Sequence, residues 1–94
     1  MKLPVPLGFD WNKANINKSW EKHKVSSREA EELFINKPLL IFDDKKHSIK
    51  EKRLVAYGRT NKDRKLTIVF TFRKEKLRVI SARDQNRKER KVYE

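Results

Sequence analysis

The seven residues Leu66-Thr67-Ile68-Val69-Phe70-Thr71-Phe72 set the architecture, because their side chains alternate along the chain. Leucine, isoleucine and phenylalanine take every second position, and threonine or valine takes the positions between them. This period of two is typical of a β-strand with one face in the core. Two further runs, 53–58 and 77–82, flank it across short connections, which join neighbouring antiparallel strands. The sequence therefore predicts an antiparallel meander, to which the apolar run 39–42 adds a strand.

A helix is predicted over residues 12–24, ahead of the strands. Apolar and aromatic side chains recur at helical spacing up to Trp20 and His23, and Asp10 or Asn12 can cap the first turn. A histidine at the end of such a stripe is more often satisfied by its own helix than used as a catalytic group.

A second helix has a clearer start. Ser26 and Glu29 have the spacing of a capping box, and Val25 and Ala30 occupy the positions of a hydrophobic staple across it. Pro38 ends this segment, because the residue before a proline is pushed out of helical geometry.

The last segment, residues 84–93, is predicted to be a helix with a thin apolar face. Such a helix gains little from burial, so we expect it to dock loosely. Two helices, an antiparallel meander and a final helix predict an α+β fold in one domain, residues 1–94.

The charge balance favours an anionic partner. The 94 residues include 25 Lys and Arg against 13 Asp and Glu, a formal net charge of +12. Nucleic acid, an anionic membrane or an acidic protein would suit this excess, and a strongly charged solvated surface is the alternative. No cysteine is present, and two histidines cannot build a zinc site on their own, so we expect no metal and no cofactor. With no long apolar run and no signal peptide, the sequence predicts a cytoplasmic protein without a membrane partner.

Short motifs along residues 8–94 resemble one known family in their order and spacing. The motifs are Phe9-Asp10-Trp11, Lys22-His23 followed by Val25-Ser26, Glu29-Ala30 and Phe34, His47-Ser48 followed by Glu51 and Arg53, Gly58, Arg78-Val79-Ile80-Ser81-Ala82-Arg83, and Glu89-Arg90 with Tyr93. No single motif is diagnostic, but together they resemble the BrnT toxins.

The resemblance implies a small ribonuclease toxin of a type II toxin–antitoxin system, with a RelE-like fold in which helices flank a compact antiparallel sheet. It also implies a ribbon-helix-helix antitoxin similar to BrnA, whose tail wraps the toxin. Operator DNA would be reached only through that antitoxin, and the pair would repress its own operon. Glu89, Arg90 and Tyr93 of the last helix are candidate antitoxin contacts.

Three positions depart from the family pattern. Lys24 stands where the family usually has glycine, which indicates a turn that accepts a side chain at a small backbone cost. Lys52 replaces an acidic residue, and Gln85 replaces an alanine and weakens the apolar face of the last helix. None of the three removes a candidate catalytic group.

Metal-free RNA cleavage needs a base for the 2′-hydroxyl, an acid for the 5′-oxygen and positive charge for the phosphorus centre. Arg78 and Arg83 are the strongest candidates for the charge, because they flank the end of a strand and arginine can grip a phosphate with two parallel hydrogen bonds. Arg78 should leave the sheet on the face opposite Leu77 and Val79. The alternative is that both arginines are only surface residues or ion-pair partners, with Glu51 or Glu89 as the available carboxylates.

His47, Glu51 and Arg53 complete the predicted catalytic set. An imidazole can act as base or acid near neutral pH, and a nearby carboxylate would raise its pKa. His47 could instead be a solvated loop histidine, and Glu51 could orient Arg53 or Arg83. Tyr57 could stack on a base or donate a proton, although a core role is the more common one. Further candidates for RNA contacts are Arg59, Arg73, Arg87 and Arg90.

Two other functions share the basic surface. A non-catalytic RNA- or DNA-binding module needs the cations but has no use for His47 and Glu51 among them. An interaction protein would use the same basic face only to receive an acidic partner.

Overall fold

A computed structural model describes residues 8–47 and 50–94, except for the side chain of His47. The described elements follow the predicted order. They are α1 (Lys13–His23), α2 (Ser27–Ile35), β1 (Leu40–Asp43), the 3-10 turn η1 (Lys45–His47), β2 (Leu54–Arg59), β3 (Lys65–Arg73), β4 (Lys76–Asp84) and α3 (Arg87–Tyr93). The α+β class predicted from the sequence is confirmed.

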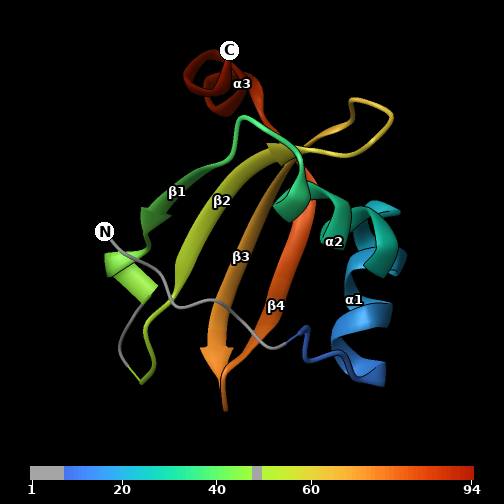
Figure 1. Ribbon diagram of the computed structural model, residues 1–94, viewed down its shortest axis with the longest axis vertical. Coiled ribbons are helices and arrows are strands. Elements are labelled where there is room, and N and C mark those ends of the chain that lie inside the picture. Colours follow the sequence, from blue (N-terminus) through green and yellow to red (C-terminus); the bar gives the residue numbers. More distant parts are fainter. Residues whose placement is uncertain (1–7, 48–49) are drawn as a thin grey trace.

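The four strands form one antiparallel sheet in the order β1-β2-β3-β4, so neighbours in the chain are neighbours in space (Figure 1). Helix α2 lies across one face of the sheet, α1 runs beside the β4 edge, and α3 sits at the end where β2 finishes (Figure 1). We call the face under α2 the core face and the other the open face. No described helix is long and apolar enough to cross the hydrocarbon part of a membrane.

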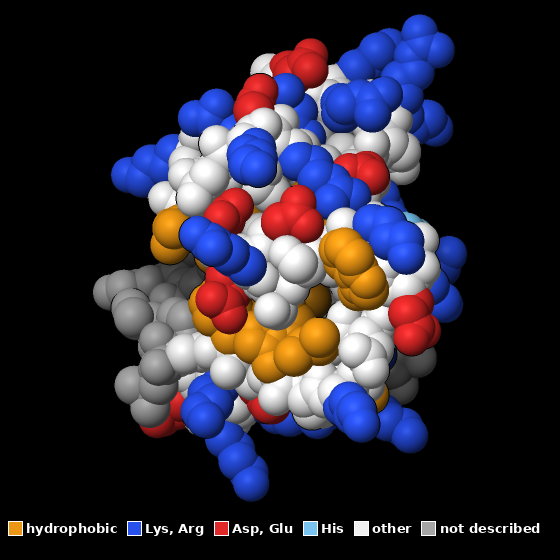
Figure 2. All heavy atoms as spheres, turned by 90° about the vertical axis from the view of Figure 1, so that its right-hand side faces the viewer, with side chains coloured by type: hydrophobic (Ala, Val, Ile, Leu, Met, Phe, Trp, Pro, Cys, Tyr) orange, Lys and Arg blue, Asp and Glu red, His pale blue; other side chains and the backbone are white. Residues whose placement is uncertain are grey.

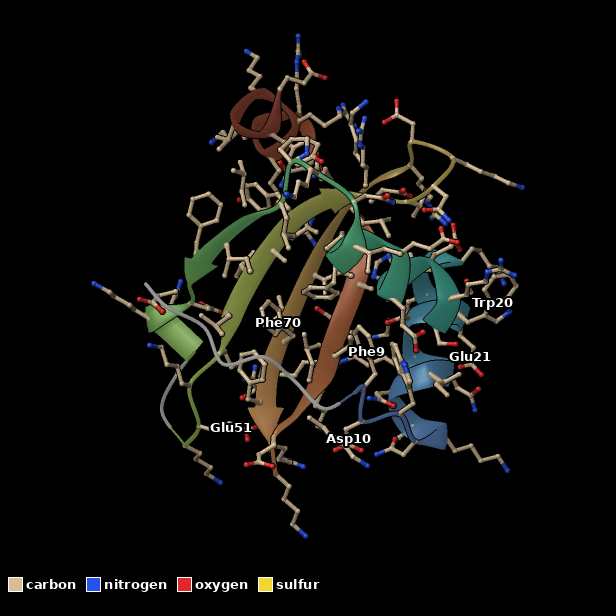
Figure 3. All side chains as sticks on the ribbon, in the orientation of Figure 1. Phe9, Asp10, Trp20, Glu21, Glu51 and Phe70 are labelled. Carbon is tan, nitrogen blue, oxygen red and sulfur yellow. The ribbon has the colours of Figure 1, made fainter. Side chains whose placement is uncertain are left out.

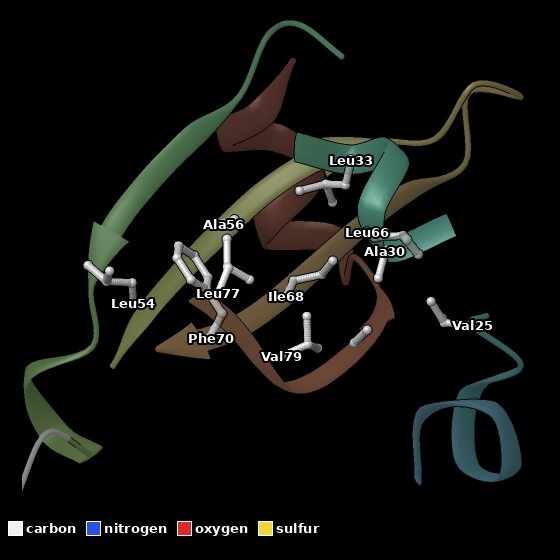
Figure 4. Close-up of a cluster of buried hydrophobic side chains, with 11 residues drawn as sticks. Val25, Ala30, Leu33, Leu54, Ala56, Leu66, Ile68, Phe70, Leu77 and Val79 are labelled. Carbon is white, nitrogen blue, oxygen red and sulfur yellow. The ribbon is translucent and has the colours of Figure 1, made fainter. Parts of the chain in front are cut away.

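The core face carries the apolar side chains that alternation predicted. Leu66, Ile68 and Phe70 of β3 are fully buried, and they pack against α2 and the flanking strands (Figure 4). Gly58 of β2 lies directly under Leu33 of α2, and a Cβ at this glycine would lie 2.5 Å from the Leu33 Cγ. The absence of a side chain at Gly58 therefore lets α2 approach the sheet closely.

The helix starts also follow the sequence. Asn12 caps α1, while Ser26 and Glu29 form the predicted capping box at α2. Lys24 ends α1 with a φ of 54°, the left-handed region that glycine adopts without strain. The turn accepts a lysine, as expected, and holds it in the less favourable backbone conformation.

Arg64 joins the start of β3 to both N-terminal helices. Its guanidinium donates to the Asp84 carboxylate at 2.7 and 3.1 Å, to Glu29 at 3.1 Å, and to the backbone carbonyls of His23 and Lys24. The Arg64 hydrogen bonds hold the pKa of Asp84 below its ordinary value. This arginine therefore ties β4, α1 and α2 together at the upper end of the sheet.

The last helix begins later than residue 84. Gln85 lies outside α3 and is buried, and its side-chain amide donates to the Leu66 carbonyl at 3.1 Å. The Gln85 amide thus donates a hydrogen bond to a strand carbonyl. Contrary to the expectation from the sequence, it does not weaken an apolar face of α3, because Gln85 is not part of that helix. Tyr93 is 7% exposed, and its hydroxyl donates to the Pro38 carbonyl at 2.6 Å, which fastens the far end of α3 beside the start of β1.

Candidate functional site

The open face carries a line of basic side chains along the three longest strands. Directly paired residues of neighbouring strands share a face, so Tyr57, Thr67 and Arg83 form one row and Val55, Val69 and Ser81 the next. The strand arginines on this face are Arg59, Arg73, Arg78 and Arg83.

A β-bulge places Arg78 and Arg83 on the same face. Five positions separate them, and strict alternation would send them to opposite faces. The register of β4 against β3 shifts at Ile80, so that Arg78 pairs with Thr71 and Arg83 with Thr67. Because those two threonines are four residues apart in a regular strand, both arginines leave the sheet on the open side.

A shallow hollow of about 420 Å³ lies in the middle of the open face. Helix α1, the segment after β1, the three longest strands and α3 all contribute to it. Its lining residues are Lys18, Asp44, Arg53, Val55, Tyr57, Thr67, Val69, Ile80, Ser81, Arg83 and Glu89. The hollow therefore combines three cations with hydroxyl groups and carboxylates.

Arg83 and Glu89 form the best-defined contact in this hollow. The Arg83 Nη1 lies 2.7 Å from the Glu89 Oε1, and Nη2 lies 2.8 Å from Oε2. The same carboxylate accepts the Thr67 hydroxyl at 2.9 Å and the Asn86 backbone N–H at 2.8 Å, which closes the capping box of α3. One buried carboxylate thus joins β3, β4 and α3.

This contact fixes the charge of both groups. The hydrogen bonds from Arg83 lower the pKa of Glu89 from 4.5 to about 2, so the carboxylate is ionised at neutral pH. Glu89 in turn raises the pKa of Arg83. A carboxylate that is held ionised in this way is a weak base, so it suits the task of orienting Arg83 better than that of removing a proton.

Tyr57 lines the hollow beside this pair. Burial raises the pKa of its phenol, and the nearby Glu89 carboxylate adds to the rise. The hydroxyl therefore keeps its proton at neutral pH and can donate a hydrogen bond. Among the predicted catalytic residues, the structure brings Arg53 and Arg83 into the hollow with Tyr57.

Arg78 and Glu51 lie toward the opposite end of the sheet from α3. Arg78 pairs with Asp10 at 3.3 Å, and Glu51 pairs with Arg73 at 3.2 Å (Figure 3, which labels Asp10 and Glu51). Glu51 thus contacts neither Arg53 nor Arg83 through these bonds. The backbone of His47 ends the 3-10 turn, but its side chain lies outside the described residues.

The remaining predicted contacts sit around α3. Arg59 lies 3.6 Å from Asp63, Arg90 donates to the Gln85 carbonyl at 3.0 Å, and Arg87 is exposed at the first position of the helix. Within residues 8–46 and 50–94, no three His, Cys, Asp or Glu side chains cluster closely enough to hold a metal ion.

Positive charge alone does not locate the site. Lys and Arg side chains also project over the side that carries α1 and α2, among scattered carboxylates (Figure 2). The sequence reasoning missed Lys18, Asp44 and Thr67, which come from three separate segments. No local motif marks these residues, because only the fold brings them together.

Comparison with protein-family models places the chain in a known family. Residues 9–89 match the model described as "Ribonuclease toxin, BrnT, of type II toxin-antitoxin system". No curated protein matches the chain in sequence.

Proposed function

Because the chain belongs to the BrnT family of ribonuclease toxins of type II toxin–antitoxin systems, we propose that it is a metal-independent endoribonuclease that cleaves RNA in the hollow of the open face. The observation that carries this placement is the Arg83–Glu89 pair. It holds a guanidinium rigidly inside a recess that Arg53 and Lys18 also line. The reaction builds negative charge around the phosphorus atom, and rigidly held cations stabilise that charge.

Arg83 retains donors for a phosphate. Its described hydrogen bonds use both N–H groups of Nη1 and one of Nη2, toward Glu89 and the Asp84 carbonyl. The Nε–H and the second Nη2–H can therefore point at two phosphate oxygens in the parallel geometry that arginine favours.

The reaction divides into two proton transfers around one phosphorus atom. A base takes the proton of the 2′-hydroxyl, and the 2′-oxygen then bonds to phosphorus. The bond from phosphorus to the 5′-oxygen breaks as the 5′-oxygen gains a proton from an acid. The products are a 2′,3′-cyclic phosphate and a 5′-hydroxyl. Tyr57 suits the donor role, because it keeps its proton at neutral pH. His47 remains our candidate for the base.

The other arginines of the open face would hold the RNA on either side of the reacting phosphate. Arg59, Arg73 and Arg78 share this face with Arg83. In this proposal Glu51 orients Arg73 rather than taking part in proton transfer, and Arg87 and Arg90 extend the cationic track onto α3.

The family implies an antitoxin partner as well as an RNA substrate. We propose a cytoplasmic complex with a BrnA-like ribbon-helix-helix antitoxin that contacts α3 at the exposed Arg90, while the buried Glu89 and Tyr93 hold that helix in place for the contact. Operator DNA would be bound only through the antitoxin, and the pair would repress its own operon. A RelE-like relationship of the fold is part of the same proposal.

The test is cleavage of a defined RNA by the purified chain, with and without ribosomes, in low salt and in the presence of EDTA. We expect fragments that end in a 2′,3′-cyclic phosphate and begin with a 5′-hydroxyl, identified by mass spectrometry. Intact RNA under every condition would contradict the enzymatic proposal, and cleavage that EDTA abolishes would contradict the metal-free chemistry.

A further inference from the structure

An exposed aromatic ring lies on the open face beside the hollow. Phe42 of β1 is 41% exposed, and its ring centroid lies 5.1 Å from that of Tyr57, with an angle of 57° between the ring planes. Phe42 pairs with Val55, whose side chain lines the hollow, so Phe42 projects from the same face.

The position of Phe42 is unlike that of the other exposed large hydrophobic residues in the described part of the chain. Trp20, Ile35 and Val92 all lie on helices. Trp20 and its neighbour Glu21 project from α1 away from the sheet (Figure 3). Phe42 alone among the four is a sheet residue on the open face, next to a residue of the hollow.

The residues around the Phe42 ring carry positive charge, which suits a polyanion. Tyr57 links Phe42 to Arg83, because the Tyr57 ring contacts Phe42 and Tyr57 shares one row across the sheet with Thr67 and Arg83. Arg59 lies two residues along β2 from Tyr57 on the same face. An aromatic platform flanked by arginines is the arrangement with which proteins bind single-stranded nucleic acid, because every base has a face that can stack.

We propose that Phe42 and Tyr57 form a stacking site for one nucleobase of single-stranded RNA, adjacent to the phosphate that Arg83 holds. This inference rests on the proposed function and adds a subsite to it. The base lies on the exposed Phe42 ring, and its flanking phosphates face Arg83 and Arg59. The site tolerates different bases, since stacking requires a flat ring rather than a particular set of hydrogen bonds.

The experiment separates binding from cleavage. A fully 2′-O-methylated RNA oligonucleotide has no free 2′-hydroxyl, so its affinity for the chain can be measured by fluorescence anisotropy whether or not the chain is a nuclease. Stacking of one base contributes about 1 to 3 kcal/mol, so we expect Phe42→Ala to weaken binding about 5- to 150-fold. Phe42→Trp should retain the affinity, and Phe42→Leu should lose it as Phe42→Ala does.

Trp20→Ala is the matched control, because it also removes an exposed aromatic side chain, but one that projects from α1 away from the sheet and does not line the hollow (Figure 3). It should bind the oligonucleotide as the wild type does. Thermal melting of each variant checks that the fold is intact, and Phe42→Leu keeps an apolar side chain in place should Phe42→Ala unfold.

A scan of abasic positions along the oligonucleotide locates the stacked base. In the wild type, one abasic position should weaken binding as much as Phe42→Ala does, and in Phe42→Ala that position should have no further effect. Full affinity of Phe42→Ala or Phe42→Leu, or an undiminished abasic effect in Phe42→Ala, would overturn the stacking site. The stacking site would also be overturned if Phe42→Ala bound RNA as the wild type does but lost antitoxin binding, because the Phe42 ring would then belong to a protein interface. Tight binding without cleavage of ordinary RNA would instead reject the proposed enzyme and leave the stacking site standing.

Discussion

The guanidinium of Arg83 and the carboxylate of Glu89 meet through two parallel hydrogen bonds of 2.7 and 2.8 Å. Glu89 also closes the capping box at the start of α3 and accepts the Thr67 hydroxyl. The orientation of Arg83 therefore depends on α3 being in place, although Arg83 itself belongs to the sheet. This dependence links the ordering of a terminal helix to the shape of the hollow.

Replacing Arg83 with alanine should remove toxicity. The loss of one rigid donor to a charge that develops in the transition state typically lowers kcat by about 10²- to 10³-fold. We expect expressed wild-type chain to arrest growth and Arg83→Ala to permit it, with the matching decrease in cleavage of a defined RNA. Arg28→Ala removes the same charge from α2, where its side chain is 88% exposed, and should behave as the wild type. Equal toxicity of Arg83→Ala would contradict the role of the hollow.

Acid should weaken the fold through Glu89. Its pKa falls from 4.5 to about 2 on folding, so its contribution is complete above pH 4.5 and is lost as the pH falls toward 2. We expect this group to account for about 1 to 3 kcal/mol of the unfolding free energy lost over that interval. Urea titrations of Glu89→Gln at pH 6 and pH 3 should therefore show a smaller decrease than the wild type. Glu21→Gln, in an exposed position of α1, should keep the wild-type dependence.

The Tyr93 hydroxyl should hold α3 against the sheet. Tyr93→Phe keeps the buried ring but removes the 2.6 Å hydrogen bond to the Pro38 carbonyl, so we expect a loss of about 1 kcal/mol, concentrated in this helix. Amide hydrogen exchange should become faster in α3 while β3 is unchanged. Equal exchange rates in α3 of both proteins would show that the packed ring alone secures the helix.

Lys24 offers a separate test of backbone strain. Its φ of 54° is easy for glycine and costs other residues about 1 kcal/mol. Both Lys24→Gly and Lys24→Ala remove the cation that lies 5.3 Å from the Trp20 ring centroid, so their difference isolates the backbone term. Chemical denaturation should show Lys24→Gly to be more stable than Lys24→Ala by about 1 kcal/mol. Equal stabilities would place the strain elsewhere.

Gly58 should not accept a side chain. A Cβ at this position would lie 2.5 Å from Leu33 Cγ in the packed core, so Gly58→Ala must shift the Leu33 side chain or the helix that carries it. We expect a loss of about 1 to 3 kcal/mol. In the double variant with Leu33→Ala, the loss should be smaller than the sum of the two single losses, because the clash is removed. Additive losses would contradict direct contact as the cause.

The sequence was sufficient for the elements of this fold. The alternation through Leu66, Ile68 and Phe70 placed the central strand and its buried face, and Ser26 with Glu29 placed the start of α2. These features are local, since each depends on residues within a few positions of one another. The start of the last helix was wrong by about three residues, because the amide of Gln85 bonds to a strand carbonyl that is distant in the chain.

The hollow was less accessible to sequence reasoning. Glu89 was one of two carboxylates that the sequence offered to Arg78 and Arg83, but the choice between them depends on how α3 packs at the end of the sheet, which no periodicity reports. Lys18 reaches the same hollow from a helix more than sixty positions away from Arg83. The pairing of Glu51 with Arg73 was also unpredictable, because several basic residues were available to it in the sequence.

The bulge at Ile80 makes this strand tolerant of a genetic lesion that its neighbour could not absorb. Deleting Ile80 would leave Arg78 and Arg83 four positions apart, the same spacing as Thr71 and Thr67 opposite them, so both arginines would still leave the sheet on the open face. Deleting Val69 from β3, which has no extra residue, would turn every later side chain of that strand over and move Phe70 out of the core. A search for inactive alleles should therefore find single-residue deletions in β3 far more often than at the bulge of β4.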